Sequence, residues 1–156
     1  MTPLLQITRR VLNTNSNASS VPLQTTCLSF LASFFSSHAP STFSSSLFEL
    51  TPVLLRALGE RHPRVAAEAF CVFSALLNTL RPVGIETVNK VYDQSVLRLK
   101  SADTVAEVRA HAKTCMGDLW VCATEVVRAK DGWHGTQCTV RQVLWMAQSR
   151  SLPVYR

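Results

Sequence analysis

A histidine and a cysteine spaced four residues apart are the first residues in this chain that could do chemistry together. His111 and Cys115 would share one side of an α-helix, where imidazole and thiolate could both bind a metal ion. A metal site needs three or four ligands, and no second pair at ligand spacing accompanies them. We therefore interpret Cys115 as a small core residue and expect no metal and no other cofactor.

The remaining candidates for nucleophilic chemistry are equally incomplete. Ser44, Ser45 and Ser46 lie in a serine-rich stretch without the GxSxG turn that exposes a nucleophile, so we interpret them as a solvated loop. The cysteines are odd in number and form no CxxC pair, which disfavours a disulfide framework and favours a reducing, intracellular compartment: Cys27, Cys71, Cys115, Cys122 and Cys138. The sequence predicts neither an enzyme nor a site for a small-molecule substrate.

Charge and hydropathy exclude two classes of partner. The 16 Lys and Arg residues exceed the 10 Asp and Glu residues, and the formal net charge of +6 favours encounter with an acidic partner. The basic residues are scattered singly, and Trp120, Trp133 and Trp145 share no basic platform, so we expect no nucleic-acid binding. The eight-residue apolar run LSFLASFF, which begins at Leu28, is far shorter than the roughly 20 residues of a membrane span, and we expect no membrane contact.

The elements that position these residues repeat along the chain. Two apolar series at one-face helical spacing are related by an offset of 43, and an earlier series precedes them by 42: Leu23, Cys27, Leu31 and Phe34; Val65, Ala69, Phe73 and Leu76; Val108, Ala112, Met116 and Leu119. They predict three equivalent helices near residues 22–36, 64–80 and 105–125.

A further apolar-periodic segment precedes each of the last two helices, so each unit is a helix pair. The first segment runs through Leu47 and Leu58, and the second through Val88 and Leu99. The short links that follow have turn composition. Thr51 before Pro52 is either a helix N-cap with proline at the first position or a bend inside a longer helix.

The residues of these units resemble a known repeat class. LTPVLLRALGERHPRVAAEAFCVFSAL, residues 50–76, is similar to the HEAT pattern, with a proline in the first helix and a valine and small residues in the second. Val108 and Arg109 followed by Ala112 resemble the valine–arginine step of that class, whereas Ala66 lacks the arginine. A period of 42 to 43 falls in the range of about 40–47 residues for HEAT and armadillo repeats.

Within that class the chain resembles the cullin-associated, neddylation-dissociated (CAND) family. SVLRLKSADTVAEVRAHAKTCMG, residues 95–117, is similar to a central repeat of the family, and TTCLSFLASF and EAFCVFSALLNTLRPV resemble the two repeats before it. The resemblance covers roughly residues 2–128. It implies an all-α, right-handed HEAT-repeat solenoid of about three units, as a segment of a longer array. We expect units at about 1–36, 43–80 and 84–125, and a divergent segment at 129–156.

We expect partner contacts on the exposed side and edge of the last unit. Glu107, His111, Thr114 and Asp118 form the polar stripe of the helix opposite its apolar face, on the side that solenoids turn to their partners. Arg98 and Lys100 precede an edge turn, and we expect them at a partner interface without a role in the core. By resemblance, Arg109 forms a structural bond between repeats.

The family resemblance also implies a function. It implies a non-enzymatic scaffold, in the cytoplasm and nucleus, that binds the cullin–RING core of ubiquitin ligases when the cullin is unmodified by NEDD8. Binding competes with the substrate-receptor adaptor and promotes receptor exchange. The alternatives are a HEAT adaptor of another class, for nuclear transport or microtubule binding, and a truncated fragment without function.

Overall fold

The computed structural model describes residues 3–14, 17, 19–80, 84–124 and 127, and all regular structure in this part of the chain is helical. Residues 129–156, which we expected to form a divergent segment, lie outside it. The elements are α1 (Pro3–Leu12), α2 (Val21–Ser37), the short 3₁₀ helix η1 (Pro40–Thr42), α3 (Ser44–Leu58), α4 (Pro63–Thr79), α5 (Ile85–Lys100) and α6 (Ala106–Cys122). The prediction of an all-α helical-repeat fold is confirmed. No described helix is long and apolar enough to cross a membrane.

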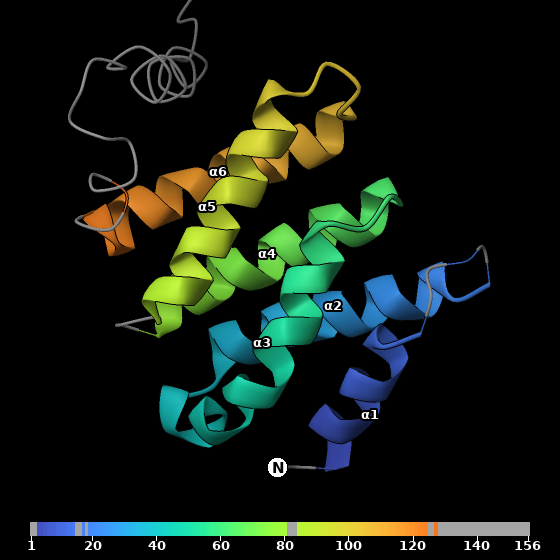
Figure 1. Ribbon diagram of the computed structural model, residues 1–156. Coiled ribbons are helices and arrows are strands. Elements are labelled where there is room, and N and C mark those ends of the chain that lie inside the picture. The colour runs from blue at the N-terminus through green and yellow to red at the C-terminus, as the bar shows by residue number, and fades with distance from the viewer. Residues whose placement is uncertain (1–2, 15–16, 18, 81–83, 125–126, 128–156) are drawn as a thin grey trace, which may run out of the picture.

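The helices form two layers (Figure 1). One layer contains α1, α3 and α5, and the other contains α2, α4 and α6, in which α4 packs between its two neighbours. Each unit is one helix from each layer, and the three expected second helices correspond to α2, α4 and α6. This is the arrangement of stacked helix pairs in an α-solenoid.

Local sequence explains where the helices begin. Proline in the first turn starts α2 and α4, where its missing N–H costs nothing. Pro52 instead lies inside α3, and the Thr51 hydroxyl donates to the Leu47 carbonyl at 2.7 Å, so Thr51 is no N-cap. The expectation of a serine loop at residues 44–46 is wrong, because these residues form the first turn of α3 and Ser46 is buried.

The core lies between the layers. In the last two units, the buried faces of the second helices are the predicted ones. Val65 and Val108 are both almost completely buried, as are Ala69 and Ala112, at equivalent positions of α4 and α6. Cys115 is also fully buried, as its position on the apolar face predicts. The small alanines allow α4 to pack closely on its neighbours, because no longer side chain separates the helices.

In the first unit, the buried face of α2 differs from the predicted one. Leu23 was expected on the buried face of α2, but its side chain is 55% exposed. The buried face comprises Val21, Gln24, Leu28, Leu31 and Phe35. In the described part of the chain, α2 packs on α4 and α1. Its buried Gln24 is satisfied by hydrogen bonds from Nε2 to the Thr14 carbonyl and hydroxyl.

Candidate functional site

A shallow groove runs along the α2, α4 and α6 layer. It has a volume of about 620 Å³. Short hydroxyl, amide and small side chains predominate in its lining, which comprises Ala32, Ser33, Ser36, Ser37, Cys71, Ser74, Ala75, Asn78, His111, Thr114 and Asp118. No described side chain of Lys or Arg lines it. Because every second helix contributes, the stacking of the units determines the shape of the groove.

Three residues of the predicted stripe lie in this groove. His111, Thr114 and Asp118 face it from α6, while Glu107 is exposed one turn before His111. The stripe is thus accessible as the spacing on the helix predicts. That these side chains contact a partner stays a prediction.

His111 contacts a cysteine of the neighbouring unit, and it is a different cysteine from the one its spacing indicated. Its Nδ1 lies 3.2 Å from Sγ of Cys71 on α4. Burial raises the pKa of the Cys71 thiol, and the charges of Glu68 and Glu107 raise it further, against the effect of a backbone hydrogen bond. Cys71 is therefore a neutral thiol near pH 7, so it serves as a hydrogen-bonding group and not as an activated nucleophile.

Cys115 lies behind the groove, in the core between α4 and α6. Burial raises the pKa of its thiol to about 12, with the charges of Asp118 and Cys71 adding to the effect and a hydrogen bond with Ser74 opposing it. Cys115 does not join His111 in a common donor set. Among the described residues, no group of three or more His, Cys, Asp or Glu side chains could hold a metal ion.

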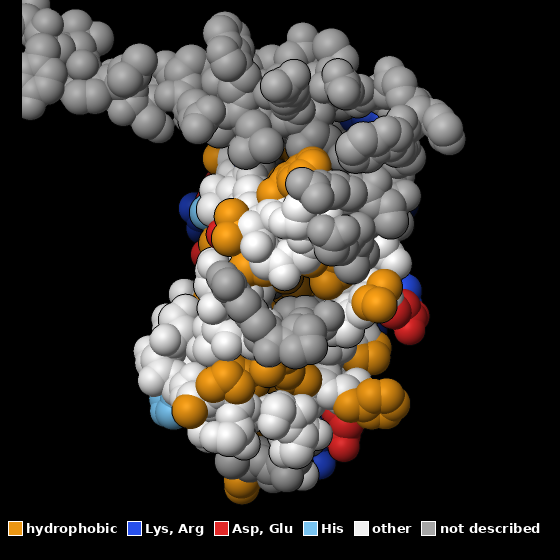
Figure 2. Space-filling model, turned by 90° about the vertical axis from the view of Figure 1, so that its left-hand side faces the viewer, with side chains coloured by type: hydrophobic (Ala, Val, Ile, Leu, Met, Phe, Trp, Pro, Cys, Tyr) orange, Lys and Arg blue, Asp and Glu red, His pale blue; other side chains and the backbone are white. Residues whose placement is uncertain are grey.

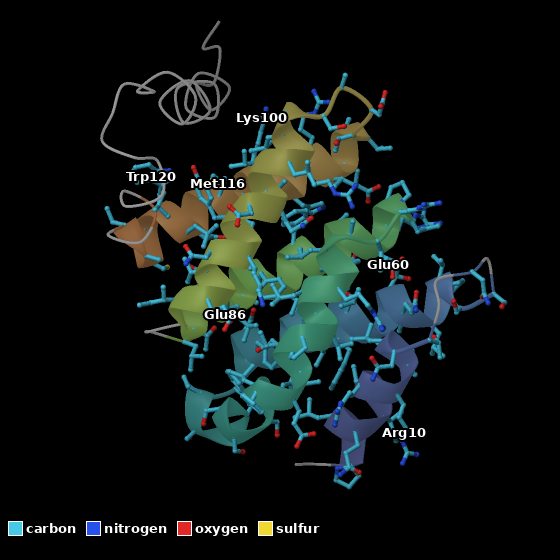
Figure 3. All side chains as sticks on the ribbon, in the orientation of Figure 1. Arg10, Glu60, Glu86, Lys100, Met116 and Trp120 are labelled. Atoms are coloured by element: carbon cyan, nitrogen blue, oxygen red, sulfur yellow. The ribbon has the colours of Figure 1, made fainter. Side chains whose placement is uncertain are left out.

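Arg98 occupies a different environment from the one we expected. We placed it on an exposed edge, but its side chain is half-buried, and Nη2 donates to the carbonyls of Leu58 at 3.1 Å and Glu60 at 2.8 Å. Leu58 is the last residue of α3 and Glu60 lies in the link that follows it, so Arg98 joins two units. Lys100, two residues later, is exposed (Figure 3), and its contact with a partner stays a prediction.

The expectation that Arg109 joins two repeats is wrong. Its Nη2 donates to the carbonyls of Ser101 at 3.1 Å, Thr104 at 3.3 Å and Ala102 at 3.4 Å, all in the turn of its own unit. The first turn of α6 lies beside the end of α5, so the guanidinium reaches this turn before any neighbouring unit. Ala66 leaves the corresponding turn of the second unit without such a donor, and there Arg98 supplies the bonds from outside.

Arg56 was missed by the sequence interpretation. Its Nη2 donates to the carbonyl of Leu12, the last residue of α1, as Arg98 does to the last residue of α3. Arg56 and Arg98 are 42 residues apart, which is the offset of the units, and this spacing could have identified the pair. The ion pair between Arg9 and Glu49, at 2.5 Å, also joins α1 to α3, but it is too exposed to contribute much to the stability of the fold.

The stacked helix pairs, inter-unit arginines and open groove define a helical-repeat scaffold. Residues 3–116 match the family described as CAND1-like, TPR repeats, and the chain belongs to this family of non-catalytic scaffold proteins. The units here repeat at 42 to 43 residues, longer than the about 34 of typical TPR units and within the range of HEAT repeats.

Two curated relatives support the same family assignment. The chain is similar to cullin-associated NEDD8-dissociated protein 1 of Arabidopsis thaliana, with 34% identity over 115 residues. It is also similar to the protein of that name from Drosophila melanogaster, with 27% identity over 118 residues. Each match covers 69% of this chain and 9% of the relative, so the chain spans about a tenth of the length of these proteins.

Proposed function

We propose that this chain is a non-enzymatic scaffold segment that contacts the cullin–RING core of ubiquitin ligases in the cytoplasm and nucleus. The observation that carries the proposal is the family match over residues 3–116, which includes α1 to α5 and most of α6. The similar proteins are cullin-associated by name. Contact is with the cullin that carries no NEDD8, and it promotes exchange of substrate receptors.

The groove is the surface proposed for this contact. It is continuous over the second helices of all three units, so it can hold an extended or helical segment of a partner. Its hydroxyl and amide groups can donate and accept hydrogen bonds without the cost of burying a lone charge. Lys100 at the turn edge adds a charge that would chiefly affect the rate of association.

The direct test is binding of the purified 156-residue chain to a purified cullin–RING core. We would immobilise the core, with and without conjugated NEDD8, and measure association by biolayer interferometry. The proposal predicts binding to the unmodified core and at least tenfold weaker binding to the modified core. Absence of binding to both forms would contradict it.

A matched pair of variants locates the contact. Thr114→Arg places a long cation in the groove, whereas Ser45→Arg makes the same change at an exposed hydroxyl on α3. Steric overlap and an unpaired charge should weaken binding of the Thr114 variant by tenfold or more and leave the Ser45 variant near the parent. Equal affinities of the two variants would remove the groove from the interface.

A further inference from the structure

The groove along α2, α4 and α6 carries negative charge, although the chain as a whole is positive. Asp118 lines the groove, and no described Lys or Arg side chain does. The helix α2 carries no charged residue. Two further carboxylates act on the groove wall, because burial and the charges of Glu68 and Glu107 raise the pKa of the Cys71 thiol. The net charge of +6 therefore predicts the wrong sign of charge for a partner at this surface.

The hydroxyl and amide groups of the groove present chiefly hydrogen-bond acceptors. Three of these side chains donate to the carbonyl four residues earlier in their own helices: Ser36 in α2 at 2.9 Å, Asn78 in α4 at 2.9 Å and Thr114 in α6 at 3.2 Å. Because the helix holds a hydrogen of each group, the lone pairs of the oxygen atom remain for a partner. The ionised Asp118 carboxylate is also only an acceptor. The groove therefore favours a partner group that donates hydrogen bonds.

A Lys ammonium or an Arg guanidinium meets both conditions at once. Each carries a positive charge and several N–H donors and has no acceptor. An Asp or Glu side chain would instead bring a like charge to Asp118 and acceptors to acceptors. Between the polar groups the groove is lined by Ala32, Ala75 and Cys71, which can cover the methylene stem of a Lys or Arg side chain.

The groove lies along the side of the stack and not at one of its ends. Its lining comes from α2, α4 and α6, which lie side by side in Figure 1. Further units would lengthen such a groove and leave it open, since solenoids bind partners along this extended surface. A segment laid across it meets oxygen atoms of all three units in turn.

We propose that the groove recognises a protein segment that carries Lys or Arg side chains. Asp118 pairs with one cation, and the oxygens of Ser36, Asn78 and Thr114 accept hydrogen bonds from this group and its neighbours. The inference rests on the proposed function, in which the groove contacts the cullin–RING core, and it adds the chemistry of the segment that enters the groove. That chemistry is the opposite of the acidic partner favoured by the net charge.

Fluorescence anisotropy of labelled peptides tests the chemistry of the groove without a cullin. One peptide has lysine at every third position among serine and alanine, and its two twins have glutamate or glutamine in place of lysine. The 156-residue chain should bind the lysine peptide at least tenfold more tightly than either twin. Equal affinities for the three peptides, tighter binding of the glutamate peptide or no binding at all would overturn the proposal.

Variants of Asp118 place the contact in the groove. Asp118→Lys reverses the charge and should weaken binding of the lysine peptide by at least tenfold, while Asp118→Asn keeps the shape and should weaken it at least threefold. Asp103→Lys is the matched control, because it makes the same reversal at an exposed carboxylate of the α5–α6 link, outside the groove. It should bind like the parent. Circular dichroism would verify folding, and equal losses in the Asp118→Lys and Asp103→Lys variants would overturn the proposal.

Nuclear magnetic resonance of the isotope-labelled chain locates the peptide independently of any variant. The lysine peptide should shift the backbone amide signals of Ser36, Asn78 and Thr114, one from each helix of the groove. Shifts confined to residues outside the groove would overturn the proposal.

The cullin–RING core separates this inference from the proposed function. If Thr114→Arg weakens binding of the core and Asp118→Lys does not, the groove is the interface and the cationic segment is wrong. If the core does not bind and the lysine peptide does, the chemistry of the groove stands and the proposed partner is wrong.

Discussion

At the residue scale, two neighbouring cations of one helix have opposite roles. Arg98 is half-buried and joins α5 to the end of α3, while Lys100 is exposed. Their positions in the sequence look alike, since both lie in the last turn before a polar link. The structure separates them by the approach of the preceding unit. In the sequence the difference is that Arg98 has an arginine counterpart 42 residues earlier, Arg56, whereas the counterpart of Lys100 is Leu58.

This difference predicts unequal costs of truncation. Arg98→Ala removes two hydrogen bonds and leaves the carbonyls of Leu58 and Glu60 without their donor, so it should lower the free energy of unfolding by about 1–3 kcal/mol. Lys100→Ala is the control on the same turn and should stay within about 0.5 kcal/mol of the parent. Urea unfolding followed by circular dichroism measures both. Equal midpoints for the two variants would contradict a structural role for Arg98.

Cys115 predicts a pH dependence of stability. Its folded pKa of about 12 lies above its ordinary value of 9.0, so folding favours the neutral thiol. The stabilisation is present in full below pH 9 and is lost as the pH rises from 9 toward 12. At pH 10 the parent should have lost about 1 kcal/mol that a Cys115→Ala variant does not lose. The test compares the change in unfolding free energy between pH 8 and pH 10, and parallel changes in both proteins would contradict it.

At the scale of elements, apolar periodicity predicted the second helices and the buried faces of α4 and α6. Val65 and Val108 occupy equivalent positions of α4 and α6, and both are almost completely buried. The same periodicity gave the wrong buried face for α2, where Leu23 is exposed. Which face of α2 is buried depends on the helices that pack beside it. The polar stripe of α6 predicted one side of the groove. The contribution of Ser33, Ser36 and Ser37 from α2 could not be predicted in this way, because it depends on how the units stack.

Ala112 tests the packing of α6 against α4. Its side chain is fully buried, so Ala112→Glu would place an unpaired carboxylate in the core at a cost of several kcal/mol. Ala110→Glu makes the same change at an exposed position of the same helix and should have little effect. We expect the Ala112 variant to lose its cooperative thermal transition in circular dichroism. A melting temperature within a degree or two of the parent would show that α6 tolerates charge on this face.

Pro52 tests the geometry of α3. It lies inside the helix, where proline removes one backbone hydrogen bond and crowds the preceding turn. Pro52→Ala should therefore raise the free energy of unfolding by about 1–3 kcal/mol. Pro63→Ala is the control, since Pro63 begins α4 and its missing N–H has no helical partner. Thermal and urea unfolding of both variants would test this, and a destabilised Pro52 variant would contradict it.

At the scale of the whole molecule, the fold is a short one-dimensional stack of helix pairs (Figure 1), and hydrophobic side chains form separate patches on the face that Figure 2 shows. The second-layer helices make the main contacts between units, and among the second-layer helices that the structure describes α4 has a neighbour on both sides. Stability in such arrays is close to a sum of unit terms and nearest-neighbour terms. Disturbance of the middle unit should therefore reach both neighbours, whereas disturbance of an end unit should stay local.

Hydrogen exchange measured by mass spectrometry can separate these two cases. Backbone amides of α4 should exchange most slowly, because opening α4 breaks both interfaces. Phe73→Ala removes a buried ring from α4 and should speed exchange in α2, α4 and α6 together, at a cost of about 3–5 kcal/mol. Leu5→Ala makes a large-to-small change in the buried face of α1 and should speed exchange in α1 and α2 while leaving α6 near the parent. Uniform acceleration of all six helices by Leu5→Ala would instead mean that the stack opens as one cooperative unit, and nearest-neighbour coupling would not describe this molecule.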